Sequence, residues 1–157
     1  MTTSKEATRR TGAGAPAKVW SKEERAAMRE GARERRSAAR RDPAAERAEG
    51  LAELEAKIAE MPEPDRTMAR RVHALVTASV PSLMPRTYYG MPAYAKDGKV
   101  ICFFKPKSKF KVRYATFEFQ ADANLDDGAF WPVSFAVNEL TTDAEERITA
   151  LVKRAAG

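Results

Sequence analysis

The sequence of 157 residues contains one cysteine, Cys102, and one histidine, His73. A single cysteine cannot form an intramolecular disulfide, and a structural zinc site needs several cysteine or histidine ligands. No apolar run approaches the length of about eighteen residues that a membrane-spanning helix needs. The N-terminus also lacks the hydrophobic segment of a secretory signal peptide. We therefore expect a soluble, cytoplasmic protein without a zinc finger, a disulfide framework or a membrane partner.

Side-chain groups typical of catalysis are also scarce. The sequence has no glycine-rich phosphate loop and no nucleophile elbow. Cys102 lies between Ile101 and Phe103, where a thiol behaves as a small apolar side chain. His73 neighbours the apolar face of a predicted helix and lacks the companions that a metal site requires. The sequence therefore predicts a binding protein and not an enzyme.

Charge is distributed unevenly along the chain. Residues 1–41 hold twelve Lys and Arg against five Glu, residues 42–60 hold two against six acidic residues, and residues 61–157 hold fourteen against eleven. The net charge of +6 therefore comes mainly from the N-terminal arm.

Helical signals define the N-terminal half. Residues 1–18 lack periodic apolar positions and are predicted to be a disordered tail. A capping box begins at Ser21, and the helix that follows it to Arg41 is basic at its end, where Arg35 and Arg36 lie. Asp42-Pro43 starts a second helix that ends near Met61. We predict a helical extension over residues 19–61 and an α+β domain over residues 62–157, which opens with a third helix. Val72 and Val76 lie on a wide apolar face of that helix, which is expected to pack in the core.

The segment from Tyr88 to Phe119 carries the main β-strand signal, with turns at Asp97-Gly98 and at residues 105–108. Residues 100–104 are continuously apolar, so their strand is expected to be central. Residues 109–114 alternate cationic and apolar side chains, which is typical of a strand with one wet face. The alternation changes parity after Ala115, which suggests a bulge or a bend at the sheet edge. A fourth strand over 130–137 contains Pro132 and is expected at an edge or a bulge, and a last helix is predicted with its cap at Thr142. The predicted fold is α+β, a two-layer antiparallel sheet of three to four strands packed on helices.

These residues resemble the YdhG-like family of small bacterial domains, which have a secretion-chaperone-like fold. The most specific matching positions are Tyr89, Gly90, Met91, Pro92 and Tyr94, in the stretch YGMPAY. Some relatives are described as frataxin-like iron chaperones, so the resemblance implies an iron-handling role and an iron-accepting protein partner. Many members carry an extra helix where this chain has only the loop 121–128, which leaves any site on that helix in doubt.

That loop holds the candidate metal ligands. Asp122, Asp126 and Asp127 could hold a hard cation such as ferrous iron weakly. Their spacing is similar to that of a calcium loop, but Asp127 and Val133 stand where that loop needs Gly and Glu. The alternative is that these are ordinary turn residues held by side chain–backbone hydrogen bonds.

The rival hypothesis is binding of nucleic acid or another polyanion, including association with the ribosome. Basic residues interleaved with Tyr and Phe suit phosphate contact and base stacking. A solvated sheet face is the alternative, because the net charge of residues 61–157 is small. A groove for a small ligand or peptide, lined by Tyr88, Tyr89, Met91 and Tyr94, is a further alternative to core packing. The predicted polyanion-binding residues are Lys105, Lys107, Lys109, Lys111, Arg113, Arg35 and Arg36.

Overall fold

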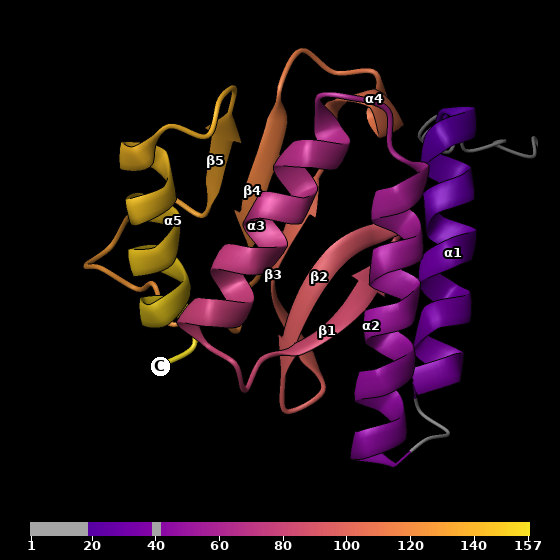
Figure 1. Cartoon of the computed structure of the whole chain (residues 1–157), viewed down its shortest axis with the longest axis horizontal. Helices are drawn as coiled ribbons and strands as arrows, with labels where there is room; N and C mark the ends of the chain where they lie inside the picture. The colour runs from indigo at the N-terminus through magenta and orange to yellow at the C-terminus, as the bar shows by residue number, and fades with distance from the viewer. Residues whose placement is uncertain (1–18, 39–41) are drawn as a thin grey trace, which may run out of the picture.

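The computed structural model describes residues 19–38 and 42–157. The tail predicted over residues 1–18 lies outside the described residues, as does Arg41 at the end of the first predicted helix. The fold is α+β, as predicted, with the helices gathered mainly before the strands (Figure 1). The helices are α1 (Lys22–Ala38), α2 (Pro43–Glu60), α3 (Asp65–Ser79), α4 (Lys107–Phe110) and α5 (Thr142–Ala155). The strands are β1 (Met84–Tyr88), β2 (Met91–Lys96), β3 (Lys99–Lys105), β4 (Ala115–Phe119) and β5 (Ser134–Val137).

The strands form one antiparallel sheet in sequential order, β1-β2-β3-β4-β5. The sheet has five strands where the sequence predicted three to four, and β1 is the additional one. Pro85 lies within β1, and an edge strand tolerates proline because one side needs no ladder hydrogen bonds. The apolar run within β3 is central, as its sequence predicted.

The strand predicted over residues 109–114 is wrong. Residues Lys107–Phe110 form the short helix α4, and Lys111 follows it in the left-handed conformation with φ 53°. The carboxylate of Asp65 accepts hydrogen bonds from the Lys107 N–H (3.3 Å) and the Ser108 N–H (2.9 Å), and so caps α4 from another helix. The regular strand starts only at Ala115, which accounts for the change of parity without a bulge at that point.

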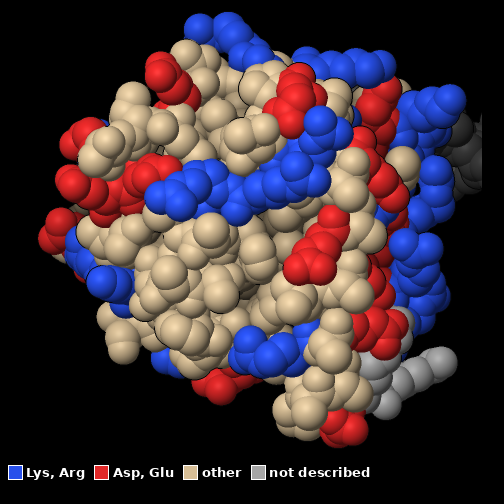
Figure 2. Space-filling view, viewed as in Figure 1, with Lys and Arg blue, Asp and Glu red and all other residues tan. Residues whose placement is uncertain are grey.

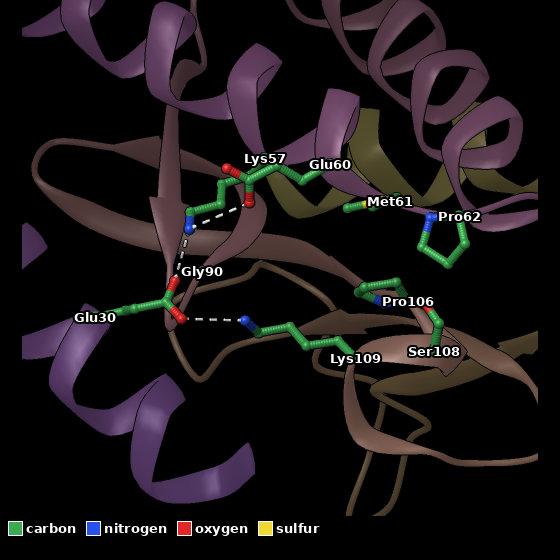
Figure 3. Close-up of a pocket in the computed structure, with 9 residues that line it drawn as sticks. All are labelled: Glu30, Lys57, Glu60, Met61, Pro62, Gly90, Pro106, Ser108 and Lys109. Carbon is green, nitrogen blue, oxygen red and sulfur yellow. Dashed lines mark hydrogen bonds and ion pairs between the residues drawn. The ribbon is translucent and has the colours of Figure 1, made fainter.

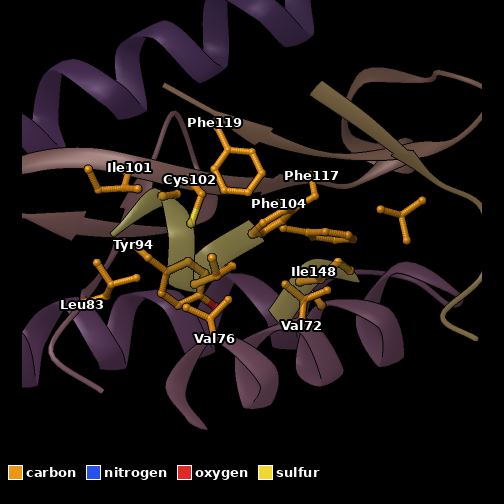
Figure 4. Close-up of a cluster of buried hydrophobic side chains, with 14 of the residues drawn as sticks. Val72, Val76, Leu83, Tyr94, Ile101, Cys102, Phe104, Phe117, Phe119 and Ile148 are labelled. Carbon is orange, nitrogen blue, oxygen red and sulfur yellow. The ribbon is translucent and has the colours of Figure 1, made fainter. Parts of the chain in front are cut away.

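The main core lies between the sheet and the helices α2, α3 and α5 (Figures 1 and 4). Tyr94, Phe104 and Phe117 project from the strands and are almost fully buried. Val72 and Val76 meet them from α3, as their helical spacing predicted. Helix α2 contributes Leu54 and Ile58 to the same core, and Met61, which directly follows the helix, is buried there as well. Removal of this apolar surface from water is the main stabilising term.

The opposite face of the sheet carries a smaller apolar cluster. Met91, Ala93 and Phe103 are buried there, and partly buried aromatic side chains pack against them. Helix α1 lies outside α2 and does not cover the main core (Figure 1). It contacts β1 and α4 instead, so it meets the sheet at the turn between β1 and β2.

Local capping signals set the helix ends. The Glu24 N–H donates to Ser21 Oγ at 3.0 Å, and the Ala45 N–H donates to Asp42 Oδ1 at 2.8 Å, so both predicted caps are confirmed. The cap of α5 is one residue earlier than predicted. The Ala144 N–H donates to the Thr141 hydroxyl at 3.1 Å, so Thr141 and not Thr142 is the N-cap.

The contact between α2 and β1 can be tested at Gly50. A Cβ at this position would lie 2.2 Å from the carbonyl oxygen of Pro85, which is backbone and cannot rotate away. We expect Gly50→Ala to lower the free energy of unfolding by about 1–3 kcal/mol through overpacking. At an exposed helical position, the same change from glycine to alanine would instead raise the free energy of unfolding by about 1 kcal/mol. Chemical denaturation measures the sign, and Ala52→Gly on the exposed side of α2 is the control. A stabilised Gly50→Ala variant would contradict this packing.

Candidate functional site

Helix α1 turns three of its four acidic side chains toward the rest of the protein. Glu23 Oε1 lies 2.7 Å from Lys111 Nζ. Glu30 lies between two ammonium groups, with Oε2 3.1 Å from Lys57 Nζ on α2 and Oε1 3.3 Å from Lys109 Nζ on α4. Glu34 Oε1 accepts a hydrogen bond from the backbone N–H of Gly90 at 3.1 Å. Three carboxylates spaced along one face therefore fix α1 against α2, α4 and the β1–β2 turn.

The turn between β1 and β2 is shaped to receive α1. Tyr89 and Gly90 both have positive φ, 50° and 76°, a conformation that glycine adopts without strain. A Cβ on Gly90 would lie 2.2 Å from Glu30 Oε2, and a Cβ on Gly31 of α1 would lie 2.7 Å from the Tyr89 ring. Two glycines thus allow the helix and the turn to approach closely. This gives Tyr89 and Gly90 of the YGMPAY stretch a structural role in docking α1.

A cavity of about 310 Å³ opens beside this contact (Figure 3). The Glu30, Lys57 and Lys109 side chains point toward one another across it, and Glu60 lies 3.7 Å from Lys57 Nζ. The charges in the cavity compensate each other, so it offers no strong field for an anion or a cation. We infer that its charged groups serve mainly to join α1, α2 and α4. The lining residues are Glu30, Lys57, Glu60, Met61, Pro62, Gly90, Pro106, Ser108 and Lys109.

Two carboxylates one helical turn apart have pKa shifts in opposite directions. Burial alone would raise the pKa of Glu30, but the hydrogen bond and charge of Lys57, together with Lys109, outweigh it and lower the pKa. Burial raises the pKa of Glu34, and contacts with Thr87 and the Gly90 N–H only partly oppose this. Within the described part of the chain, Glu34 Oε2 is buried without a hydrogen-bond partner. At neutral pH ionised Glu30 therefore stabilises the contact, whereas ionised Glu34 costs stability.

The opposite face of α1 is rich in arginine. Four exposed residues, three of them spaced four apart, make up what we call the arginine face: Arg25, Arg29, Arg33 and Arg36. Within residues 19–38 and 42–157, none of the four makes a hydrogen bond or an ion pair. Figure 2 shows basic side chains along the outer edge at α1, beside an acidic column over α2. The structure thus separates most of the charges on α1 by sign: Glu23, Glu30 and Glu34 face the rest of the protein, and the arginine face lies on the exposed side.

The five predicted basic residues of 105–113 do not form a single cationic row. Lys109 and Lys111 are engaged by Glu30 and Glu23, as described above. Lys105 Nζ lies 4.8 Å from the centre of the Phe110 ring, and the Arg113 guanidinium lies 4.9 Å from that of Tyr114. Lys107 is half-buried in α4. Of the two predicted arginines, Arg36 is on the arginine face, and Arg35 donates to the Tyr89 hydroxyl at 3.4 Å.

The predicted metal ligands lie on the surface in the loop 121–128. Asp122 Oδ1 is 3.5 Å from Lys99 Nζ, so its charge is partly neutralised. Asp126 accepts a hydrogen bond from Arg154 through its backbone carbonyl, at 3.3 Å, and not through its carboxylate. Asp127 is exposed. Within the described residues no three His, Cys, Asp or Glu side chains are placed to hold a metal ion together.

His73 and Tyr94 form a polar contact within the core. His73 Nδ1 lies 2.9 Å from the Tyr94 hydroxyl, and burial lowers the pKa of His73. Burial also raises the pKa of Cys102 to about 12, so its thiol is protonated and unreactive at neutral pH. Tyr94 is therefore a core residue, one of the two roles that its sequence context allowed, although its hydroxyl also reaches a small cavity between α2 and α3.

Arg25, Arg29 and Arg33 were not among the predicted polyanion-binding residues. Their four-residue spacing is visible in the sequence and places them on one helical face. The missing information was which face of α1 would be covered, because alanines and one methionine give this helix only a weak apolar stripe.

No protein-family model, curated protein or solved structure matches this chain. The resemblance to the YdhG-like family therefore stays a prediction. Within the part of the chain that the structure describes, no helix is both long and apolar enough to cross a membrane.

The docking of α1 can be tested by comparing Glu30→Gln with Glu34→Gln. Glu30→Gln should lower the free energy of unfolding at neutral pH by about 1–2 kcal/mol, because two partly buried ammonium groups lose their partner. Glu34→Gln keeps the acceptor for Gly90 N–H and removes a buried charge, so stability should be unchanged or higher. Thermal and urea unfolding measure both variants.

The pH dependence gives a second readout of the same pair. The stabilisation by Glu30 is present above the ordinary glutamate value of 4.5 and is lost as the pH falls through its lowered pKa. The destabilisation by ionised Glu34 is absent below pH 4.5, the ordinary glutamate pKa, and appears as the pH rises through the raised pKa of Glu34. Both variants should therefore approach the parent protein in acid. A Glu34→Gln variant that loses as much stability as Glu30→Gln would contradict this assignment.

Proposed function

We propose that this protein is a non-enzymatic binding protein for a polyanion, with nucleic acid as the ligand class, and that α1 is its primary contact. The observation that carries the proposal is the arginine face, a set of four exposed guanidinium groups without partners in the described structure. Guanidinium groups bind phosphate through two parallel hydrogen bonds and remain charged at any physiological pH.

The spacing of the arginine face suits an extended anionic ligand. Successive positions four residues apart are about 6 Å apart along a helix axis. Arg25 and Arg36 are therefore separated by about 16 Å along α1. A single small anion would need convergent groups, whereas these groups lie in a line. Like charges four residues apart also destabilise a helix by about 0.2–0.5 kcal/mol per pair, a cost that a bound polyanion would remove.

The docked position of α1 supports the same function. Three of the four acidic residues of the helix, Glu23, Glu30 and Glu34, are held against basic side chains or the Gly90 N–H, so these three reduce the field of the arginine face on the solvent side little. A free helix of this composition would expose both signs of charge. The fold thereby converts a helix of modest net charge into a surface with one cationic side.

Iron handling through Asp122, Asp126 and Asp127 stays a prediction, and no observation in the described residues favours it over polyanion binding. Cytoplasmic localisation, an iron-accepting partner and ribosome association likewise stay predictions.

The test is binding of a fluorescein-labelled DNA duplex, followed by fluorescence anisotropy at several salt concentrations. The logarithm of the association constant should fall linearly with that of the salt concentration, by about 0.9 for each phosphate contact. Arg29→Gln/Arg33→Gln should weaken binding and reduce the slope by about twice that amount.

The matched control is Arg147→Gln, an exposed arginine of α5 that lies 3.9 Å from Asp143. It changes the net charge without touching α1 and should alter the slope little. Absence of binding by the parent protein at low salt, both to the duplex and to a single strand of the same length, would overturn the proposal, as would an unchanged slope in the double variant.

A further inference from the structure

The sheet face turned away from the main core carries an aromatic surface next to α1. We call Tyr88, Tyr89, Phe103 and Phe110 the aromatic platform; all four belong to or pack against the smaller apolar cluster. The Tyr88 ring lies 5.2 Å from that of Phe103 and 4.5 Å from that of Tyr89. Tyr88, Tyr89 and Phe110 are only partly buried. The helices α2, α3 and α5 pack on the other face of the sheet.

Cations from three elements border the aromatic platform. Lys105 Nζ on β3 lies 4.8 Å from the centre of the Phe110 ring. Arg35 on α1 lies 5.7 Å from the centre of the Tyr89 ring. Arg86 on β1 is two residues from Tyr88 and so shares its face of the strand. Positive charge beside accessible aromatic rings is the arrangement that contacts the backbone and the bases of a single strand together.

The platform also has a boundary. Glu118 on β4 pairs in register with Phe103 on β3, and its carboxylate accepts a hydrogen bond from the Thr116 hydroxyl at 3.1 Å. This negative charge disfavours a phosphate backbone beyond β3. The surface that suits an anionic ligand therefore runs from β3 across the β1–β2 turn to α1.

We propose that the ligand is single-stranded nucleic acid, whose bases stack on Tyr88, Tyr89 and Phe110 while its phosphates contact Arg35, Lys105 and the arginine face. This inference rests on the proposed function and adds the strandedness of the ligand. Arg35 joins the two parts, because it follows Gly31 by one helical turn and reaches Tyr89. A duplex keeps its bases stacked inside, so only a single strand can use the rings.

The experiment compares a labelled oligothymidylate with a labelled duplex of the same length, both titrated by anisotropy at one salt concentration. The parent protein should bind the single strand more tightly. Tyr88→Leu and Phe110→Leu, which keep an apolar side chain but remove the ring, should each weaken single-strand binding about ten-fold. Neither change should alter duplex affinity, because the arginine face is intact. Tyr88→Phe should bind the single strand like the parent protein.

The control for ring removal is Phe130→Leu. Phe130 is 91% exposed and precedes β5, at the opposite edge of the sheet, so this change should leave both affinities unaltered. Thermal unfolding shows whether the leucine variants remain folded. If either unfolds, the ring-proton resonances of Tyr88 and Tyr89 in the parent protein decide, because stacked bases shift them upfield.

The outcomes separate the two proposals. Equal affinity for both ligands, or single-strand binding that the leucine variants leave unchanged, overturns the platform but leaves the arginine face in place. Unshifted tyrosine resonances on binding of the oligothymidylate overturn it as well. Failure of the parent protein to bind either ligand overturns both proposals.

Discussion

The contact of the Glu30 carboxylate with two ammonium groups fixes the position of α1, on which the candidate site depends. Lys57 belongs to α2 and Lys109 to α4, so one side chain joins three helices. All three charged groups are about three-quarters buried. Ion pairs at this depth are screened less than surface pairs, and loss of one partner costs more than the pair contributes. With α1 in this position, Glu30 and Glu34 are covered by the rest of the protein and the arginine face is exposed to solvent.

The main core and the candidate site are stabilised by different kinds of contact. The core between the sheet and α2, α3 and α5 is held by apolar burial, which tolerates many exchanges of similar volume. The contact of α1 relies on close approach instead, with Gly31 against Tyr89 and Gly90 against Glu30. Such contacts depend on individual residues and their charges. The region around α1 is therefore more sensitive to single changes and to pH than the core is.

Charge is the property that the fold reorganises most. The lysines of residues 105–111 are abundant in the sequence, yet Lys109 and Lys111 neutralise acids of α1. The four residues of the arginine face remain without partners in the described structure, whereas Arg35 of the same helix contacts Tyr89. A count of charges along the chain cannot distinguish basic residues that form ion pairs from those that do not, because ion pairing depends on which surfaces meet. The aromatic platform likewise combines rings that are distant in sequence, from β1, the β1–β2 turn, β3 and α4.

The sequence alone determined the α+β class, the caps at Ser21 and Asp42, the central position of residues 100–104 and the buried face of α3. These features depend on interactions within a few residues or on a simple apolar period, so they can be predicted from short stretches of the sequence. The tertiary structure decided that residues 107–110 form a helix, because the capping carboxylate of Asp65 is distant in sequence. It also decided which face of α1 is covered, since the partners Lys57 and Lys109 lie on other elements. The apolar surface of α1 is too small to indicate the covered face from the sequence.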